Sequence, residues 1–286
     1  MTKKQLSVVE LEVIAEDIRV SIIKSLETAG SGHSAGPLGL ADIFTALYFD
    51  VLKHDPKNPE WLERDVLLLS NGHCVPVQYA AMAHAGYFPI PELLTLRKHG
   101  SRLQGHPERT RLPGLENTSG PLGCGLSQAC GMALAMRMNK QSHRFIYCVM
   151  GDGELNEGNI WEAAMLASKE KLHNIIGIID RNNIQIDGPT EVVMPLEDLK
   201  YKWEAFGWRV IEIDGNNMEA IIDACSMARA IVEKPIMIIA HTIPGKGVDF
   251  MEYDFHWHGM PPNHEQAKIA LHEIRTLKGK IKGEHE

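Results

Sequence analysis

Two short polar segments carry side chains that could bind a cation and an anion together. One is Gly-Asp-Gly-Glu at residues 151–154, and the other is Asp-Arg-Asn-Asn at residues 180–183. The carboxylate of Asp152 and the amide of Asn182 offer the oxygen ligands that Mg²⁺ prefers, and Mg²⁺ usually keeps part of its coordination shell for phosphates. The glycines on either side of Asp152 let the backbone approach an anion closely. We therefore predict a diphosphate that is held through a metal ion.

The sequence around these segments predicts a unit of strand, helix and strand. Continuous apolar runs at 145–150 and 175–180 are typical of strands that are buried on both faces. Between them, residues 159–168 are rich in helix formers, with apolar residues three and four apart. In such a unit both polar segments follow the carboxyl ends of parallel strands, where open α/β sheets bind ligands. The N-terminus of the helix favours negative charge at the same place.

A simpler interpretation is that Gly-Asp-Gly forms only a tight turn, with Asp152 capping a helix. The spacing favours a functional role. Gly-Asp-Gly, followed about thirty residues later by Asn-Asn with strand, helix and strand between them, resembles the thiamine-diphosphate-binding motif of thiamine-dependent enzymes. The resemblance implies that Asp152 and Asn182 bind Mg²⁺, or Ca²⁺ or Mn²⁺, by side chain and Ile184 by its carbonyl. Gly153 would lie against the cofactor.

Strand-like and helix-like segments alternate along the whole chain. Further buried strands are predicted at 65–70, 208–214 and 235–241, and further helices at 6–28, 40–52 and 218–233. The glycine-rich stretch 34–39 is expected to be irregular. Because no Pro- or Ser-rich linker interrupts the alternation, we predict one α/β domain at 1–286 with a doubly wound, mainly parallel sheet flanked by helices. A charged, frayed tail is expected at about 278–286.

Composition excludes several classes of protein. The 286 residues are 44% hydrophobic, which suffices for a sizeable core. A net charge of −8, with scattered Lys and Arg, gives no reason to expect nucleic acid or a membrane surface as a partner. The five cysteines form no C-x-x-C pair, which favours reduced thiols. Since no apolar run is long enough for a membrane span or a signal-peptide core, a cytoplasmic location is expected.

Histidine is frequent, and four of the 14 histidines stand in glycine-containing loops beside predicted strand ends or helix starts. Taken singly, such a residue is usually a solvated or capping side chain. His256 and His258 have the spacing of a zinc ligand pair, but no thiol or carboxylate motif completes the set. Together with the diphosphate motif, the loops resemble those of transketolase, in the same order and across nearly the whole chain. The segments that carry the resemblance are Gly32-His33, Ser70-Asn71-Gly72-His73, Gly105-His106-Pro107-Glu108, Gly120-Pro121-Leu122-Gly123 and Trp257-His258-Gly259.

The resemblance implies a role for each of these residues. His33 and His258 would face the substrate carbonyl and stabilise charge as a carbon–carbon bond breaks, and His106 would contact substrate hydroxyls. His73 would lie near the thiazolium and diphosphate of the cofactor, and Glu157 at a dimer interface beside its pyrimidine. Histidine suits these roles because its pKa lies near neutrality. The cofactor contacts implied are His73, Gly120, Leu122, Asp152, Gly153, Asn182, Ile184 and His258.

The length of the chain bears on the expected assembly. Transketolases of full length continue with a pyrimidine-binding domain and a C-terminal domain, so this chain resembles the N-terminal subunit of a split transketolase. The implied activity is transfer of a two-carbon ketol unit from a ketose phosphate to an aldose phosphate, as in the pentose phosphate pathway. We expect the chain to be inactive alone and to work with a separate C-terminal subunit in an α2β2 heterotetramer. Unusual sulfonated or branched sugars remain open as substrates.

Two other functions fit parts of the sequence. The α subunit of a 2-oxoacid dehydrogenase also binds thiamine diphosphate between chains, but it would not account for the four loop histidines. A non-catalytic module that binds the cofactor and regulates a partner is the other alternative. The intact histidines argue against it.

Overall fold

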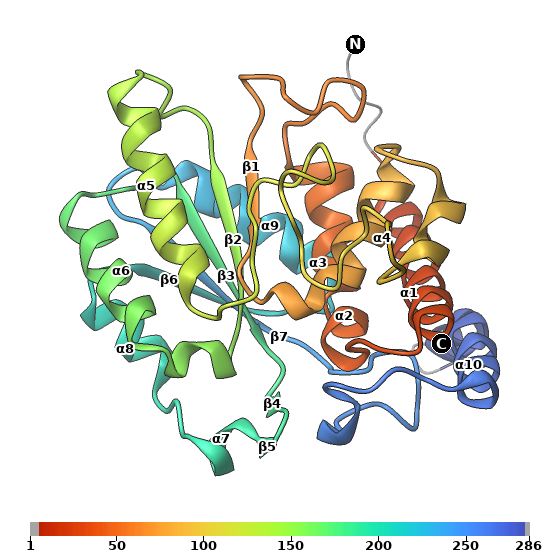
Figure 1. Cartoon of the computed structure of the whole chain (residues 1–286). Helices are drawn as coiled ribbons and strands as arrows, with labels where there is room; N and C mark the ends of the chain where they lie inside the picture. Colours follow the sequence, from red (N-terminus) through yellow and green to blue (C-terminus); the bar gives the residue numbers. More distant parts are fainter. Residues whose placement is uncertain (1–5, 284–286) are drawn as a thin grey trace.

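The computed structural model describes residues 6–283, with side chains as far as Ile274. Within this range the centre of the molecule is a five-stranded parallel sheet with strand order β1-β2-β3-β7-β6 (Figure 1). Its strands are β1 (Val66–Leu69), β2 (Ile146–Gly151), β3 (Ile175–Arg181), β6 (Arg209–Asp214) and β7 (Ile236–His241). Each strand agrees with a predicted run to within one residue. The predicted α/β class with a parallel sheet flanked by helices is confirmed.

Helices cover both faces of this sheet (Figure 1). One layer consists of α5 (Cys124–Met138), α6 (Gly158–Lys169) and α8 (Leu199–Ala205). The other contains α1 (Val8–Ala29), α3 (Ala41–Ala46), α4 (Val75–Ala85), α9 (Met218–Ala230) and α10 (His264–Gly283). In β1, Leu67 and Leu69 pack into the second layer, whereas Val66 and Leu68 pack into the first. Because water is excluded from both faces, β1, β2 and β3 are continuous apolar runs rather than alternating ones.

The expectation of irregular structure at 34–39 was wrong. Residues Ala35–Gly39 form a short helix, α2, whose residues are all buried. A Cβ on Gly36 would lie 2.7 Å from Cys74 Sγ, and one on Gly39 would lie 2.8 Å from the Ile243 carbonyl oxygen. These glycines therefore permit close packing of a helix rather than an irregular backbone. The helix predicted at 40–52 is also modified, since α3 continues into a π-helical turn at Leu47–Val51.

Short elements follow the strand ends. An antiparallel pair, β4 (Ile184–Gln185) and β5 (Gly188–Pro189), follows β3 and leads into α7 (Thr190–Val193). Short 3-10 helices lie at Gly72–Cys74, Ile90–Thr95, Gly153–Asn156 and Phe255–Trp257. Two of them, Gly72–Cys74 after β1 and Gly153–Asn156 after β2, change the direction of the chain directly beside the candidate site.

The C-terminal prediction is tested only in part. Residues 278–283 continue helix α10, whereas 284–286 lie outside the described residues, so the expected fraying of the tail stays a prediction. Among the helices of residues 6–283, none has the length and apolar character needed to cross a bilayer.

Candidate active site

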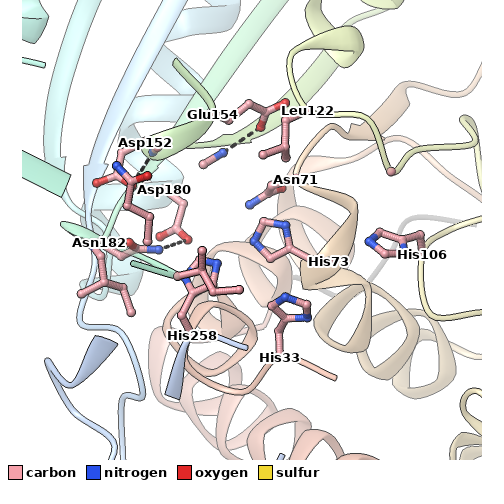
Figure 2. A pocket seen from close by; sticks show the side chains of 16 residues that line it. His33, Asn71, His73, His106, Leu122, Asp152, Glu154, Asp180, Asn182 and His258 are labelled. Atoms are coloured by element: carbon pink, nitrogen blue, oxygen red, sulfur yellow. Dashed lines mark hydrogen bonds between the residues drawn. The ribbon is translucent and has the colours of Figure 1, made fainter. Parts of the chain in front are cut away.

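A cavity of about 300 Å³ opens at the carboxyl ends of β1, β2 and β3 (Figure 2). This is the edge of the sheet at which the sequence predicted a ligand. The cavity brings together most of the predicted site residues from loops that are far apart in the sequence. Its lining residues are His33, Asn71, His73, His106, Gly120, Leu122, Gly151, Asp152, Gly153, Glu154, Asp180, Asn182, Ile184, Gln185, Ile186 and His258.

Asp152 follows β2 directly, and its side chain is held by several donors. The residue is 1% exposed. Its Oδ1 accepts a hydrogen bond from the Gly153 amide at 2.7 Å, and its Oδ2 accepts one from the Asn183 amide at 2.8 Å and one from the Thr190 hydroxyl at 3.2 Å. The Arg181 guanidinium also pairs with Oδ2, at 3.1 Å. Burial raises the pKa of Asp152, and Arg181 and the amide donors oppose that rise. The carboxylate is therefore fixed in place by its own chain.

The end of β3 is organised in the same way. Asn182 donates from Nδ2 to Asp180 Oδ2 at 2.8 Å, and its Oδ1 accepts from the Ile184 amide at 3.0 Å. Asp180 also accepts a hydrogen bond from the Thr242 hydroxyl, which follows β7. Burial, with the neighbouring charge of Asp152, raises the pKa of Asp180 to about 7. Asp180 thus orients the side chain of Asn182. This hydrogen bond explains why an aspartate stands two residues before the asparagine at the end of the strand.

Asp152 and Asn182 lie on the same side of the cavity (Figure 2), and Ile184 lines the cavity as well. None is more than 6% exposed. A carboxylate, an amide and a backbone carbonyl are hard oxygen ligands, and this set fits Mg²⁺ better than a soft metal. Within the described residues no group of three or more His, Cys, Asp and Glu side chains could hold a metal. The oxygen set of Asp152, Asn182 and Ile184 fits a hard divalent cation by its own chemistry.

Three histidines from three separate loops meet in the cavity. The ring centroids of His33 and His73 lie 4.8 Å apart, those of His73 and His258 5.2 Å, and those of His33 and His258 5.6 Å. Burial, with a smaller contribution from the neighbouring histidines, lowers the pKa of His33 to about 4. Burial lowers the pKa of His73 well below its ordinary range and also lowers that of His258. The cluster is therefore made of neutral imidazoles at pH 7, each with one donor and one acceptor nitrogen.

Glu154 connects three loops around the cavity. Its carboxylate accepts hydrogen bonds from the Ser70 hydroxyl after β1, from the Gly123 amide at 2.7 Å and from the Gly151 amide at 3.0 Å. The residue is 2% exposed, and burial raises its pKa. Glu154 therefore positions the glycine loop that contains Gly120 and leads into α5.

The remaining predicted residues lie at the edge of the site. Gly120 and Leu122 line the cavity, and a Cβ on Gly120 would meet nothing within 4 Å. His106 lines the cavity but is exposed, and burial and Arg97 lower its pKa. Glu157 does not line the cavity. It is exposed at the start of α6, with its Cβ against Gly123, so its role at an interface stays a prediction.

Sequence reasoning missed several lining residues. Asn71, Glu154, Asp180, Gln185 and Ile186 were not predicted as site residues, although each lies in or beside a predicted motif. Asn71 and Asp180 could have been found, because each is a polar residue at the end of a buried strand. Glu154 carries no such signal, since its contacts come from loops about 30 and 80 residues away.

The site's geometry agrees with a match to a known family. A family model described as "Transketolase, thiamine diphosphate binding domain" matches residues 11–277. The chain belongs to the transketolase family. Its place in that family is the N-terminal domain that binds thiamine diphosphate, and the shared region covers nearly all of the chain.

Two relatives match the transketolase chain over almost their whole length. It is 44% identical over 266 residues to the 6-deoxy-6-sulfo-D-fructose transketolase subunit SqwG of Clostridium sp. (strain MSTE9), covering 93% of this chain and 96% of the relative. It is 40% identical over 275 residues to an apulose-4-phosphate transketolase subunit of Phocaeicola vulgatus, covering 96% and 97%. Both names describe subunits.

The fold is also that of solved transketolases. The crystal structure of the transketolase mutant R525L from Pichia stipitis superposes with a TM-score of 0.87 at 33% identity. The match covers 96% of this chain and 41% of the Pichia stipitis chain. This chain therefore spans less than half the length of that transketolase.

The residues present fit thiamine diphosphate. The Nδ1 atoms of His33 and His258 and both side-chain polar atoms of Asn71 are buried in the described part of the chain with no hydrogen-bond partner. Such atoms are costly to bury unless something binds them. They belong to a cavity that has a carboxylate and an amide on one side and imidazoles on the other (Figure 2). A cofactor with a metal-bound diphosphate and a polar reactive ring matches both sides.

Proposed function

We propose that this chain is the cofactor-binding subunit of a transketolase that transfers a two-carbon ketol unit between sugars bearing an anionic group. The observation that carries the proposal is the meeting of His33, His73 and His258 in one cavity with Asp152 and Asn182. The oxygen ligands suit a metal diphosphate, and the neutral imidazoles suit an oxygen that gains charge during a reaction. A module that only bound the cofactor would have no use for the imidazoles.

When bound, thiamine diphosphate supplies a nucleophilic carbon and a sink for the electron pair of a breaking carbon–carbon bond. The chain's own residues position and protonate. His33 and His258, neutral at pH 7, donate N–H groups to the substrate carbonyl oxygen as negative charge develops on it. The His73 ring lies against both of them and helps to exclude water from this part of the cavity.

Asp152, Asn182 and the carbonyl of Ile184 would hold Mg²⁺, with Ca²⁺ or Mn²⁺ as substitutes. Among the described residues Oδ1 of Asp152 has one amide donor, so this oxygen retains lone-pair capacity for a cation. Gly153 and Gly151 keep the turn free of side chains where the diphosphate would approach. These residues orient the cofactor without taking part in bond breaking.

Charge at the mouth of the site favours substrates with a terminal anion. Arg97 is exposed and lines, together with His106, a second hollow of about 450 Å³ that shares His106 with the first. Its guanidinium lies against Gly105, where an added Cβ would be 2.8 Å from Cζ. The relatives are named for a sulfonated and a phosphorylated sugar, and a guanidinium binds either anion.

We further propose that turnover requires a second chain carrying a pyrimidine-binding domain, in an α2β2 assembly. The relatives matched along their whole length are named as subunits, and this chain spans 41% of a solved transketolase. Exposed apolar side chains support this, because Ile186, which lines the cavity, is 64% exposed and Val192 on α7 is 78% exposed. Glu157, at the start of α6, is exposed as well.

The test is co-expression of the chain with a protein that carries the pyrimidine-binding domain of a transketolase. Ketol transfer to ribose 5-phosphate would be followed with xylulose 5-phosphate, 6-deoxy-6-sulfo-D-fructose or apulose 4-phosphate as donor. We expect transfer from at least one donor only when both chains, thiamine diphosphate and Mg²⁺ are present. Decarboxylation of pyruvate by the pair, or normal transfer by this chain alone, would contradict the proposal.

A further inference from the structure

Asn71 is a buried polar residue whose side chain has no partner within the described residues. It follows β1 and precedes the 3-10 turn Gly72–Cys74, whose last amide is bound by the Asn71 carbonyl at 2.8 Å. The residue is 1% exposed, and neither Oδ1 nor Nδ2 makes a hydrogen bond in the part of the chain that the structure describes. Its carboxamide lines the cavity between Leu122, Glu154 and His73 (Figure 2).

Two other buried asparagines of this chain, Asn117 and Asn182, do have hydrogen-bond partners for their side chains. Asn117, 4% exposed, accepts a hydrogen bond from the Leu69 amide at 3.3 Å and donates one to the Leu69 carbonyl at 3.2 Å. Asn182 likewise uses both its amide nitrogen and its oxygen. These residues have structural roles that their contacts explain. The contacts of Asn71 explain none, and burying an amide without partners is unfavourable.

The cavity needs neutral donors if it is to bind an anion. No Lys or Arg is among the lining residues in the described range, and three carboxylates are. Backbone amides near the turn are partly used already, since Gly151 and Gly153 donate to Glu154 and Asp152. The carboxamide of Asn71 is a neutral donor that is still available, and a diphosphate oxygen is a strong acceptor.

Asn71 also stands at the correct end of the cavity. A Cβ built on Gly151 would lie 3.7 Å from Asn71 Cβ and 3.9 Å from its Nδ2, so the amide borders the glycine turn after β2. This is the turn at which the Gly-Asp-Gly pattern predicts the diphosphate. We propose that Asn71 binds the cofactor's diphosphate by donating an N–H of its carboxamide. The inference rests on the proposed function, because it assigns a further residue to the same site.

The test compares the complex of both chains in which this chain is wild type or carries Asn71→Ala, Asn71→Asp or Asn117→Ala. Calorimetric titrations in Mg²⁺ would use thiamine diphosphate and, separately, inorganic pyrophosphate, which carries only the anionic part. We expect Asn71→Ala to weaken both ligands at least tenfold, and Asn71→Asp to weaken them more because it places a negative charge against the anion. The thermal midpoint of the ligand-free Asn71→Ala chain should equal or exceed that of the wild type, whereas Asn117→Ala should lower it.

Two results would overturn the inference in different ways. Wild-type affinity for both ligands in the two Asn71 variants would remove the role of Asn71 and leave the proposed function in place. Absence of thiamine diphosphate binding by the wild-type complex of both chains in Mg²⁺ would overturn the proposed function and the role of Asn71 with it.

Discussion

The two sides of the cavity differ in whether their side chains have hydrogen-bond partners within the chain. On one side, each side-chain polar atom of Asp152 and Asn182 is held by a donor or acceptor of the chain itself. On the side of His33 and His258, each buried Nδ1 lacks a partner among the described residues. The first side is held by its own hydrogen bonds, and the second leaves hydrogen-bonding capacity for a bound cofactor or substrate. Substitutions on the two sides should therefore fail in different measurements.

The largest expected effect is on turnover. In the assembled enzyme His258→Ala should lower kcat by about 10²–10⁴-fold, because a donor to the developing charge is lost. Stability should change by less than about 1 kcal/mol, since Nδ1 of His258 has no partner to lose in the described part of the chain. His256→Ala is the matched control, because that histidine is exposed and pairs with Asp254 in its own turn. An equal loss of kcat in His258→Ala and His256→Ala would show that the loss is not specific to the histidine in the cavity.

On the side of Asp152 and Asn182, a substitution should lower the stability of the chain. Asp152→Ala leaves Arg181 without one of its partners and removes the acceptor of Asn183 and Thr190, so we expect about 2–4 kcal/mol of destabilisation in urea unfolding. Asp187→Ala, on the exposed turn between β4 and β5, should change stability little. If Asp152→Ala unfolded at the same urea concentration as the wild type, the hydrogen bonds of this side would not be what fixes it.

A pH titration of stability separates the sides further. His33 has a lowered pKa of about 4 when folded, against about 6.5 unfolded, so the unfolded chain binds the proton first as the pH falls. The stability that depends on a neutral His33 is fully present above pH 6.5. It falls as the pH drops below that value, and about 2 kcal/mol of the free energy of unfolding is lost at pH 5. The buried carboxylates act with the opposite sign, because their pKa values are raised.

The measurement therefore compares how the free energy of unfolding changes with pH in the wild type and in His33→Gln. Between pH 7 and pH 5, urea unfolding should show the wild type losing about 2 kcal/mol more than the variant, which cannot take up this proton. His73 and His258 face His33 and remain in both proteins, as do His106 and Arg97. Parallel pH profiles would show that burial does not keep His33 neutral.

The smallest effect concerns the mouth of the site. Arg97→Ala should raise KM for a phosphorylated or sulfonated sugar by about three- to tenfold and leave an uncharged ketose unaffected. Arg102→Ala is the control, because the charge of Arg102 is already paired with Glu92. Its Nε lies 2.6 Å from Oε1 of that carboxylate. An equal change for charged and uncharged sugars would show that Arg97 does not recognise the anion.

The sequence predicted the sheet well because β1, β2 and β3 are apolar on both faces, and such runs are difficult to mistake when helices cover both sides. It predicted that Asp152 and Asn182 lie at the same edge of the sheet, because both follow strands of one unit. It was wrong about α2, since the glycines at 36 and 39 serve packing against Cys74 and Ile243 that no local pattern reveals.

The part of the site that could not be predicted depends on tertiary contacts. Glu154 resembles an ordinary acidic residue at a helix start, and only the fold brings Ser70 and Gly123 to its carboxylate. Asn71 is informative because its side chain lacks a partner in the described structure, which no sequence pattern can express. The meeting of the histidines was implied by the resemblance to transketolase, and the structure adds their separations and neutral state.

One set of titrations tests the central claim most directly. Thiamine diphosphate would be titrated, with Mg²⁺ and with a chelator, into the complex of both chains carrying wild-type, Asp152→Asn or His258→Ala sequences. We predict Mg²⁺-dependent binding that Asp152→Asn weakens at least tenfold and that His258→Ala, which removes a cofactor contact but no metal ligand, weakens less. Binding that is indifferent to Mg²⁺ and to the Asp152 substitution would contradict the claim.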